Sequence, residues 1–153
     1  MSNRYGLEIR AAAASDAAGL AALLSETGAP VGTADVAVRL EALQRDGGTI
    51  LVAVEWGPPS GLIALSPVRT LDAPRPFGLI TTLVVAAESR RRGIGRVLLK
   101  AAGRAARQAG CDRLHVRVGP DQRALHAFCA AAGFTEADHL FERPLLKRGS
   151  GEG

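Results

Sequence analysis

Residues 90–96 read Arg-Arg-Arg-Gly-Ile-Gly-Arg, and their types and spacing favour the binding of a phosphate group. An apolar run at residues 79–85, typical of a buried strand, precedes them, and a helical pattern over residues 94–109 follows. Because a helix macrodipole is already positive at its first turn, three arginines there are unfavourable unless an anion is bound. Glycines allow a ligand to approach the backbone, and the first N–H groups of a helix are free to bind it. The stretch therefore predicts a strand–loop–helix phosphate site.

The composition is that of one globular domain. The chain has 153 residues, of which 47% are hydrophobic and 22% charged. We expect a single domain over residues 1–148 and a flexible, glycine-rich tail at residues 149–153. The two cysteines, Cys111 and Cys129, lack the spacing of a metal site, so we predict free thiols and no bound metal. No apolar run approaches the length of a membrane span and no signal-peptide pattern is present, which favours a cytoplasmic protein without a membrane partner.

The positive charge is concentrated in one segment. Residues 90–107 hold six arginines, one lysine and no acidic residue, whereas the whole chain has a formal net charge of +4. Such a patch suits either a phosphorylated small molecule or nucleic acid. Four Phe, one Tyr and one Trp are too few for an evident base-stacking surface, so we expect no nucleic-acid partner. Arg96, Lys100 and Arg104 follow one another at four-residue spacing and can equally form a solvated helix face.

Periodicity and turn residues predict the elements that position this loop. Strands are expected at residues 7–10, 49–56, 61–69, 78–85, 113–118 and 134–143, the second and third forming a hairpin. Helices are expected after Ser15 or Asp16, after Thr33, and over residues 94–109 and 122–132. The order β-α-α-β-β-β-α-β-α-β predicts an α/β (α+β) fold, with a mixed, mostly antiparallel sheet and helices on both faces.

Two motifs in this order resemble those of the GNAT superfamily, the acyl-coenzyme A-dependent N-acyltransferases. The family's Arg/Gln-x-x-Gly-x-Gly/Ala loop, between a strand and a helix, is matched by Arg90, Gly93 and Gly95. The segment at residues 128–134, Phe-Cys-Ala-Ala-Ala-Gly-Phe, is similar to the family's Phe-Tyr-x-x-x-Gly-Phe. The resemblance extends over about residues 7–146.

The resemblance implies acetyl-CoA as co-substrate. Backbone amides of the loop would hold its pyrophosphate, and the main chain of residues 83–85 would pair with the pantetheine arm where two strands splay apart. An N–H near Val84 or Val85 could stabilise the thioester oxyanion. The position often held by Asn in the family falls near Gln122 or Asp121, although Asp121 also suits a helix N-cap. The residues implied in CoA binding are Leu83, Val84, Val85, Arg90, Arg91, Arg92, Gly93, Ile94, Gly95, Arg96, Gln122 and Phe128.

The catalytic residues are the weakest part of the match. Many family members have a Tyr at the position of Cys129, where it protonates the departing CoA thiolate. A thiol can donate a proton but reaches less far than a phenol, so Cys129 is either the acid or a small packing residue. The strand at residues 78–85 lacks the Glu that some relatives use as a base and offers only Thr81 and Thr82. Histidine side chains ordinarily titrate near neutral pH, so His115 is either a candidate base or a surface or packing residue.

We therefore expect an N-acetyltransferase in which a primary amine of a small molecule or peptide directly attacks the bound thioester. The alternative is a CoA-binding domain with little or no transferase activity, because the usual Tyr and Glu are missing. Acceptor groups would come from residues 29–33, residues 71–77 and the last strand, none of which carries an acidic cluster for a polyamine or aminoglycoside. Uncovered strand edges make a homodimer plausible.

Overall fold

The computed structural model describes residues 6–146 of the chain. The chain forms two compact units, which divide after Arg117. The expected single domain over residues 1–148 stays a prediction, and the expected tail at residues 149–153 lies outside the described residues.

The first unit is built on a five-stranded sheet in the order β1-β2-β3-β4-β5. The first four strands pair antiparallel and β5 pairs parallel to β4, which confirms the mixed, mostly antiparallel sheet predicted from the sequence. β2 and β5 are each shorter than expected. The strands are β1 (Glu8–Ala11), β2 (Thr49–Val54), β3 (Gly61–Val68), β4 (Phe77–Val85) and β5 (Leu114–Val116).

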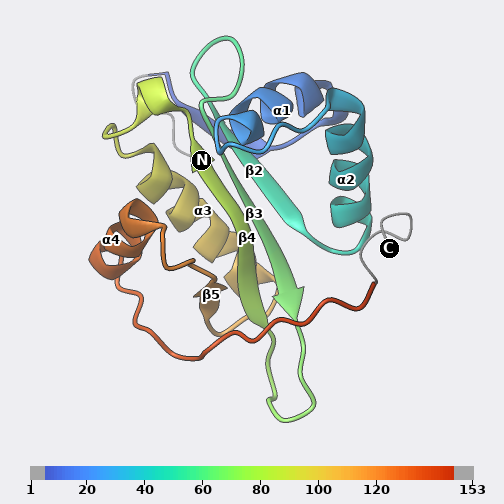
Figure 1. Ribbon diagram of the computed structural model, residues 1–153, viewed down its shortest axis with the longest axis vertical. Helices are drawn as coiled ribbons and strands as arrows, with labels where there is room; N and C mark the ends of the chain where they lie inside the picture. The colour runs from blue at the N-terminus through green and yellow to red at the C-terminus, as the bar shows by residue number, and fades with distance from the viewer. Residues whose placement is uncertain (1–5, 147–153) are drawn as a thin grey trace. The chain divides into compact units, whose positions relative to one another are not determined.

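Helices cover both faces of this sheet (Figure 1). α1 (Ala17–Ser25) and α2 (Thr33–Arg45) pack together on one face, and α3 (Ile94–Gln108) packs against β2, β3 and β4 on the other. Short 3₁₀ helices precede α1 and follow β4, at Ala14–Asp16 and Ala87–Ser89. Thr33 is the first residue of α2 and Gly32 is its N-cap, so the expected capping role of Thr33 is wrong.

The close approach of α3 to the sheet depends on a glycine in β3. A Cβ on Gly61 would lie 3.0 Å from Leu98 Cδ1 and 3.1 Å from Ile94 Cγ2. Leu98 and Ile94 are buried on the inner face of α3, so a Cβ at residue 61 would force these side chains, or the helix that carries them, to shift by a few tenths of an ångström. This contact fixes the first turn of α3 over the start of β3, beside the end of β4.

β4 is irregular at its centre. Ala64 of β3 pairs with Thr82, but Leu65 pairs with Ile80, so Thr81 is an extra residue and forms a β-bulge. On its other side, β4 pairs with β5 only over Gly78–Ile80. Among the paired strands that the structure describes, none adjoins the half of β4 after the bulge on this side.

The second unit contains one helix, α4 (Arg123–Ala131), followed by an extended segment. The last strand predicted at residues 134–143 is wrong, because residues 132–146 form no strand. The segment contains Phe134, Leu140 and Phe141, but polar residues lie between them at 135, 136, 138 and 139, and no described segment pairs with it. Phe141 is 90% exposed, so this segment buries no strand face. The N-cap of α4 is Gln122, so the expected N-cap role of Asp121 is also wrong.

Candidate functional site

The loop between β4 and α3 ends in a glycine that starts the helix. Gly93 is the N-cap of α3 in the left-handed conformation, with φ of +80°, and a Cβ built there would meet nothing within 4 Å. Val97 donates the first helical hydrogen bond, to the Gly93 carbonyl at 3.1 Å. Within the described residues, the N–H groups of Ile94, Gly95 and Arg96 have no protein acceptor. Three unpaired backbone donors and the positive end of the helix therefore lie next to the open space at Gly93, as an anion site requires.

The three arginines of the loop have different surroundings, although all are exposed. Arg90 Nε donates to the Val85 carbonyl at 3.2 Å and ties the loop to the end of β4. Arg92 forms an ion pair with Glu55 at the end of β2. Arg91 has φ of +68°, which is uncommon for a residue with a side chain, and it makes no ion pair with any described residue.

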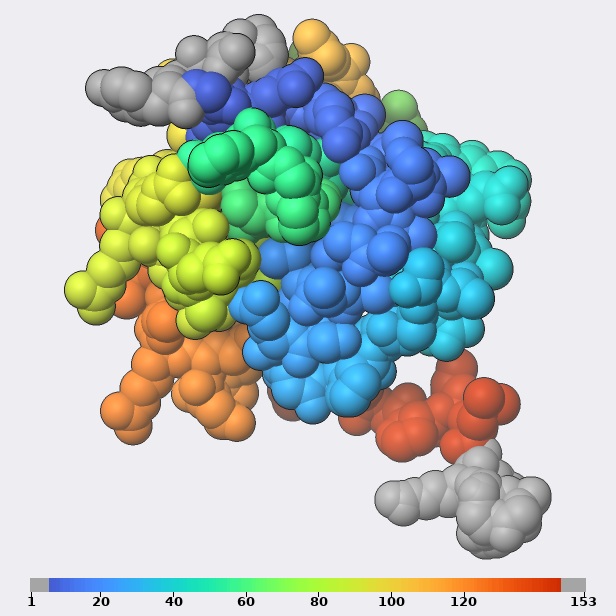
Figure 2. All heavy atoms as spheres, turned by 90° about the horizontal axis from the view of Figure 1, so that it is seen from above, coloured from blue at the N-terminus to red at the C-terminus, as the bar shows by residue number. Residues whose placement is uncertain are grey.

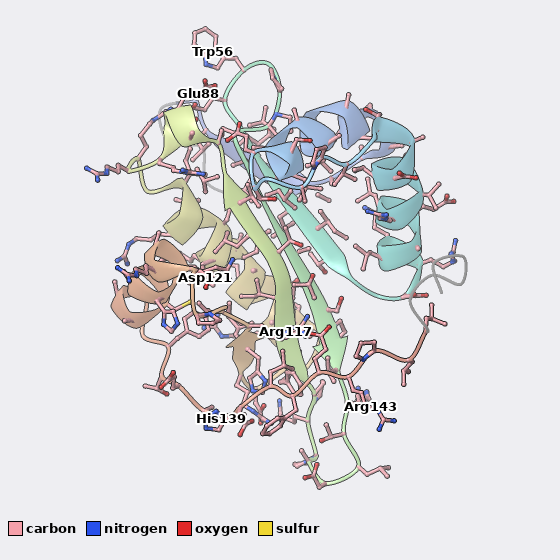
Figure 3. The ribbon with its side chains drawn as sticks, in the orientation of Figure 1. Trp56, Glu88, Arg117, Asp121, His139 and Arg143 are labelled. Carbon is pink, nitrogen blue, oxygen red and sulfur yellow. The ribbon has the colours of Figure 1, made fainter. Side chains whose placement is uncertain are left out.

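The ends of β2 and β4 thus lie together at the surface. In Figure 2 the yellow-green loop after β4 lies beside the green turn between β2 and β3. The Ala86 N–H also bonds the Ser60 carbonyl at 2.8 Å. Trp56 lies in the same turn and points away from the sheet (Figure 3), with 84% of its surface exposed.

The second half of β4 offers main-chain groups on its open side. Hydrogen-bonded pairs alternate along an antiparallel ladder, and the Ala86–Ser60 bond sets the alternation, so Val84 and Thr82 bond toward β3. The N–H and C=O groups of Leu83 and Val85 therefore face the opposite side. The Arg90–Val85 bond agrees with this direction. This open side begins where β5 stops pairing, so an extended ligand can add to the sheet there.

The helix that begins at this site separates its charged and apolar faces. Arg96, Lys100 and Arg104 are exposed. This agrees with the interpretation of their four-residue spacing as a solvated helix face. Leu98 and Ala102 are fully buried against the sheet. The positively charged side chains of α3 therefore lie on its outer face, away from the sheet.

His115 lies in β5 within a small aromatic cluster. Its ring stacks on Phe77, with ring centroids 4.0 Å apart and planes at 25°. His115 pairs with Leu79, four residues before Leu83, which is about 13 Å along an extended strand. Its surroundings thus match the packing interpretation better than that of a base at residues 83–85.

The remaining predicted site residues belong to the second unit. Gln122 Oε1 accepts the Gly119 N–H at 2.7 Å, so this side chain holds the turn before α4. Phe128 is half-buried, and Cys129 is buried, where desolvation raises the pKa of its thiol. A raised pKa keeps the thiol protonated at neutral pH. Cys111 and Cys129 are both free, as predicted.

For the acetyl transfer that the resemblance implies, we expect Cys129→Ala to keep the rate within a few-fold, because a buried thiol on an alanine-rich helix serves mainly to pack. The measurement is kcat and KM for CoA-dependent acetylation, with circular dichroism to verify folding. Cys111→Ala is the matched control, since Cys111 is also buried and free. A large fall in kcat for Cys129→Ala alone, with unchanged CoA affinity, would instead identify Cys129 as the acid.

A pocket that the sequence did not predict lies on the opposite face of the sheet. Its volume is about 280 Å³, and its walls come from α1, the loop before α2, α2, β2, β3 and β4. All but two of its lining residues are apolar, and the exceptions are Arg39 and Thr82. Of the loops expected to bind an acceptor, residues 29–33 contribute Val31, whereas residues 71–77 contribute none of the described lining.

Residues 6–146 contain no group of three or more His, Cys, Asp or Glu side chains placed to hold a metal ion. No helix among them has the combined length and apolar character that a membrane crossing needs.

Comparison with known proteins places this arrangement in context. The family described as "Acetyltransferase (GNAT) family" matches residues 8–134. A proposed acetyltransferase from Agrobacterium tumefaciens is 30% identical, with a TM-score of 0.79 over 90% of this chain and 99% of that one. A GNAT family acetyltransferase from Staphylococcus aureus is 19% identical, with a TM-score of 0.77 over 92% of this chain and 99% of that one.

A third solved structure is the aminoglycoside N-acetyltransferase AAC(6')-Iy in complex with CoA. It is 20% identical, with a TM-score of 0.79 over 92% of this chain and 95% of that one. At this identity the likeness concerns the fold alone. No curated protein sequence matches the chain.

Proposed function

The chain belongs to the GNAT acetyltransferase family, and from this premise we propose that it transfers an acetyl group from acetyl-CoA to a primary amine of a small molecule or peptide. The proposal rests on one observation: the open side of β4 and the anion site follow each other directly. The open side of β4 at residues 83–85 leads to the anion site at the start of α3. An extended arm with a pyrophosphate at one end fits this succession.

The residues present suit acetyl-CoA. The N–H groups of Ile94, Gly95 and Arg96 would hold the pyrophosphate, with Gly93 leaving room in front of them. Arg91 would add a positive charge, while Arg90 and Arg92 hold the loop to its neighbours. The main chain of Leu83 and Val85 would pair with the pantetheine amides. When bound, acetyl-CoA supplies the acetyl group as a thioester.

The protein's part in the reaction is placement and electrostatics. A neutral amine attacks the thioester carbonyl carbon, the C–S bond breaks, and the amine proton ends on the departing thiolate, by way of water or a side chain. An N–H of Leu83 or Val85 would donate to the carbonyl oxygen as negative charge develops there. Thr81 and Thr82 are the polar side chains of β4 beside this position. Holding the amine and the thioester in the orientation for attack would lower the barrier further.

Mass spectrometry of a broad amine mixture incubated with acetyl-CoA and the protein tests the proposed reaction. We expect products heavier by one acetyl group that need both protein and acetyl-CoA. A heat-denatured sample controls for spontaneous acetylation. Tight CoA binding without any acetylated product would support the CoA-binding alternative and contradict the proposed transferase. The homodimer and the cytoplasmic location stay predictions.

CoA should also stabilise the fold against heat. A ligand at a hundred times its Kd adds about 2.7 kcal/mol, which for a domain of this size raises Tm by about 5–10 °C. The shift should shrink with added salt, because the loop arginines are exposed. Scanning fluorimetry with CoA measures it, and pantetheine, which lacks the pyrophosphate, is the control. An equal shift with pantetheine would argue against the anion site.

A further inference from the structure

The pocket between the α1–α2 layer and the sheet adjoins the open half of β4. Thr82 lines the pocket with its side chain, together with its β3 partner Ala64. The next residue, Leu83, presents its main chain to the open side of β4, and consecutive Cα atoms are about 3.8 Å apart. A molecule that fills the pocket can thus bring one end to the part of β4 where the acetyl group is expected.

The wall of this pocket is held in place before any ligand binds. Glu26, after α1, accepts the Ala87 N–H at 3.0 Å and so ties the α1–α2 loop to the end of β4. The Thr27 hydroxyl donates to the Leu24 carbonyl at 2.7 Å. The Ser25 hydroxyl bonds the Ala21 carbonyl at 2.8 Å and accepts the Val31 N–H at 3.4 Å. Leu24 and Val31, which line the pocket, are therefore positioned by hydrogen bonds on both sides of the loop.

The lining excludes one class of amine and favours another. No acidic side chain is among the described lining residues, so a polycation would find no partner and would meet Arg39. Arg39 is exposed on α2 and forms no ion pair with any described residue. A guanidinium that borders an apolar pocket is suited to bind a carboxylate. The volume, about 280 Å³, is at the lower limit for ligand pockets and suits a small molecule.

From this geometry we infer that the acceptor is a small amine with an apolar body and a carboxylate, the body lying among Leu24, Leu40 and Leu62 and the carboxylate on Arg39. The inference rests on the proposed acetyl transfer and extends it to a substrate class. Thr82 is the one polar side chain on the strand side of the pocket, and its hydroxyl would accept a hydrogen bond from the amine. Arg39 is a specificity-determining residue in this scheme.

Two amines that differ only in the carboxylate test the role of Arg39. L-Phenylalanine has the carboxylate, and 2-phenylethylamine is the same skeleton without it. We expect the ratio of their kcat/KM values to favour phenylalanine and to fall about tenfold or more in Arg39→Met, and further in Arg39→Glu. Arg45→Glu is the matched control, because Arg45 is exposed on the same helix outside the pocket lining and its change should leave the ratio as it is.

Each outcome separates this inference from the proposed function. Acetylation with spermidine preferred to both probes, or a ratio that Arg39→Glu leaves unchanged, would overturn the inference while the transferase stands. If no amine is acetylated although CoA binds, the proposed function fails. Calorimetry with N-acetyl-L-phenylalanine then decides on the pocket: binding that Arg39→Glu removes supports the carboxylate site, and no binding to the unaltered protein overturns it.

Discussion

Gly93→Val should lower the affinity for CoA by about a hundredfold, a loss of about 2.7 kcal/mol of binding free energy. Valine is strongly disfavoured at φ of +80°, so the loop must leave the conformation that presents the N–H groups of α3. Its branched side chain would also occupy the open space in front of Gly93, where the structure leaves room for a phosphate. Isothermal titration calorimetry with CoA measures the change.

Gly110→Val is the matched control for this substitution. Gly110 follows the other end of α3 with φ of +89°, and a Cβ there also meets nothing within 4 Å. Both variants should lose similar folding stability from backbone strain, but only Gly93→Val should lose affinity. Equal CoA affinity in two folded variants would reject the loop as the pyrophosphate site. Adding a bulky replacement of Gly95 to Gly93→Val should remove any remaining binding.

The phosphate loop could be predicted because its signal is local. A strand, a glycine-spaced loop, three arginines and a helix follow one another within about thirty residues. The left-handed Gly93 and the bounds of α3 agree with that pattern, since few residue types can begin a helix in this way. The strand hairpin and the first two helices are local in the same sense.

The open side of β4 depends on contacts that no local pattern contains. Pairing of β4 with β5 stops at Ile80, and the bulge at Thr81 shifts the register against β3. Thr81 and Thr82 look alike in sequence, yet one is the extra residue and the other lines the pocket. Tertiary packing decides whether two strands separate. The separation of β4 and β5 could therefore be expected only from the resemblance to the GNAT superfamily.

Residue types alone could predict neither the pocket nor the surroundings of His115. Leu, Val and Ala at helical spacing predict a core, and the buried apolar residues of α1 and α2 do belong to one core cluster with residues of the sheet. The pocket is the part of that surface which the packing leaves unfilled, which no spacing reveals. Histidine is a residue type that suits a base, but the ring on which His115 stacks, Phe77, lies 38 residues earlier, so this contact could not be foreseen.

The predicted last strand failed for a related reason. A strand needs a partner for its N–H and C=O groups, and a short apolar pattern does not supply one. β5 has only three residues, Leu114–Val116, and they pair with β4. Residues 134–143 therefore include apolar side chains typical of a strand, but no described strand pairs with them.

Asp16→Asn should lower the free energy of unfolding by about 2 kcal/mol at pH 7. Asp16 is buried, with 7% of its surface exposed, and accepts bonds from Arg10 Nη1 at 2.8 Å, Arg10 Nη2 at 2.9 Å and the Ala13 N–H at 2.7 Å. An amide cannot accept both guanidinium bonds with a full charge. Because Asp16 is the N-cap of α1, the loss should loosen the helix that lines the apolar pocket.

The effect of Asp16→Asn should disappear in acid. The side-chain hydrogen bond from Arg10 holds the pKa of Asp16 below its usual value in the folded protein. A group with a lowered folded pKa stabilises fully above its unfolded pKa, about 3.9, and loses that contribution as pH falls through the folded pKa. Urea unfolding at pH 7, 5 and 3 measures the free energy of unfolding of the variant and of the unaltered protein. The difference between the two free energies should be equal at pH 7 and 5 and smaller at pH 3.

Asp112→Asn is the control, because the Asp112–Arg113 pair is exposed and should contribute less than about 1 kcal/mol at any pH. A difference for Asp16→Asn that stays constant to pH 3 would show that the amide perturbs packing rather than removing an ion pair.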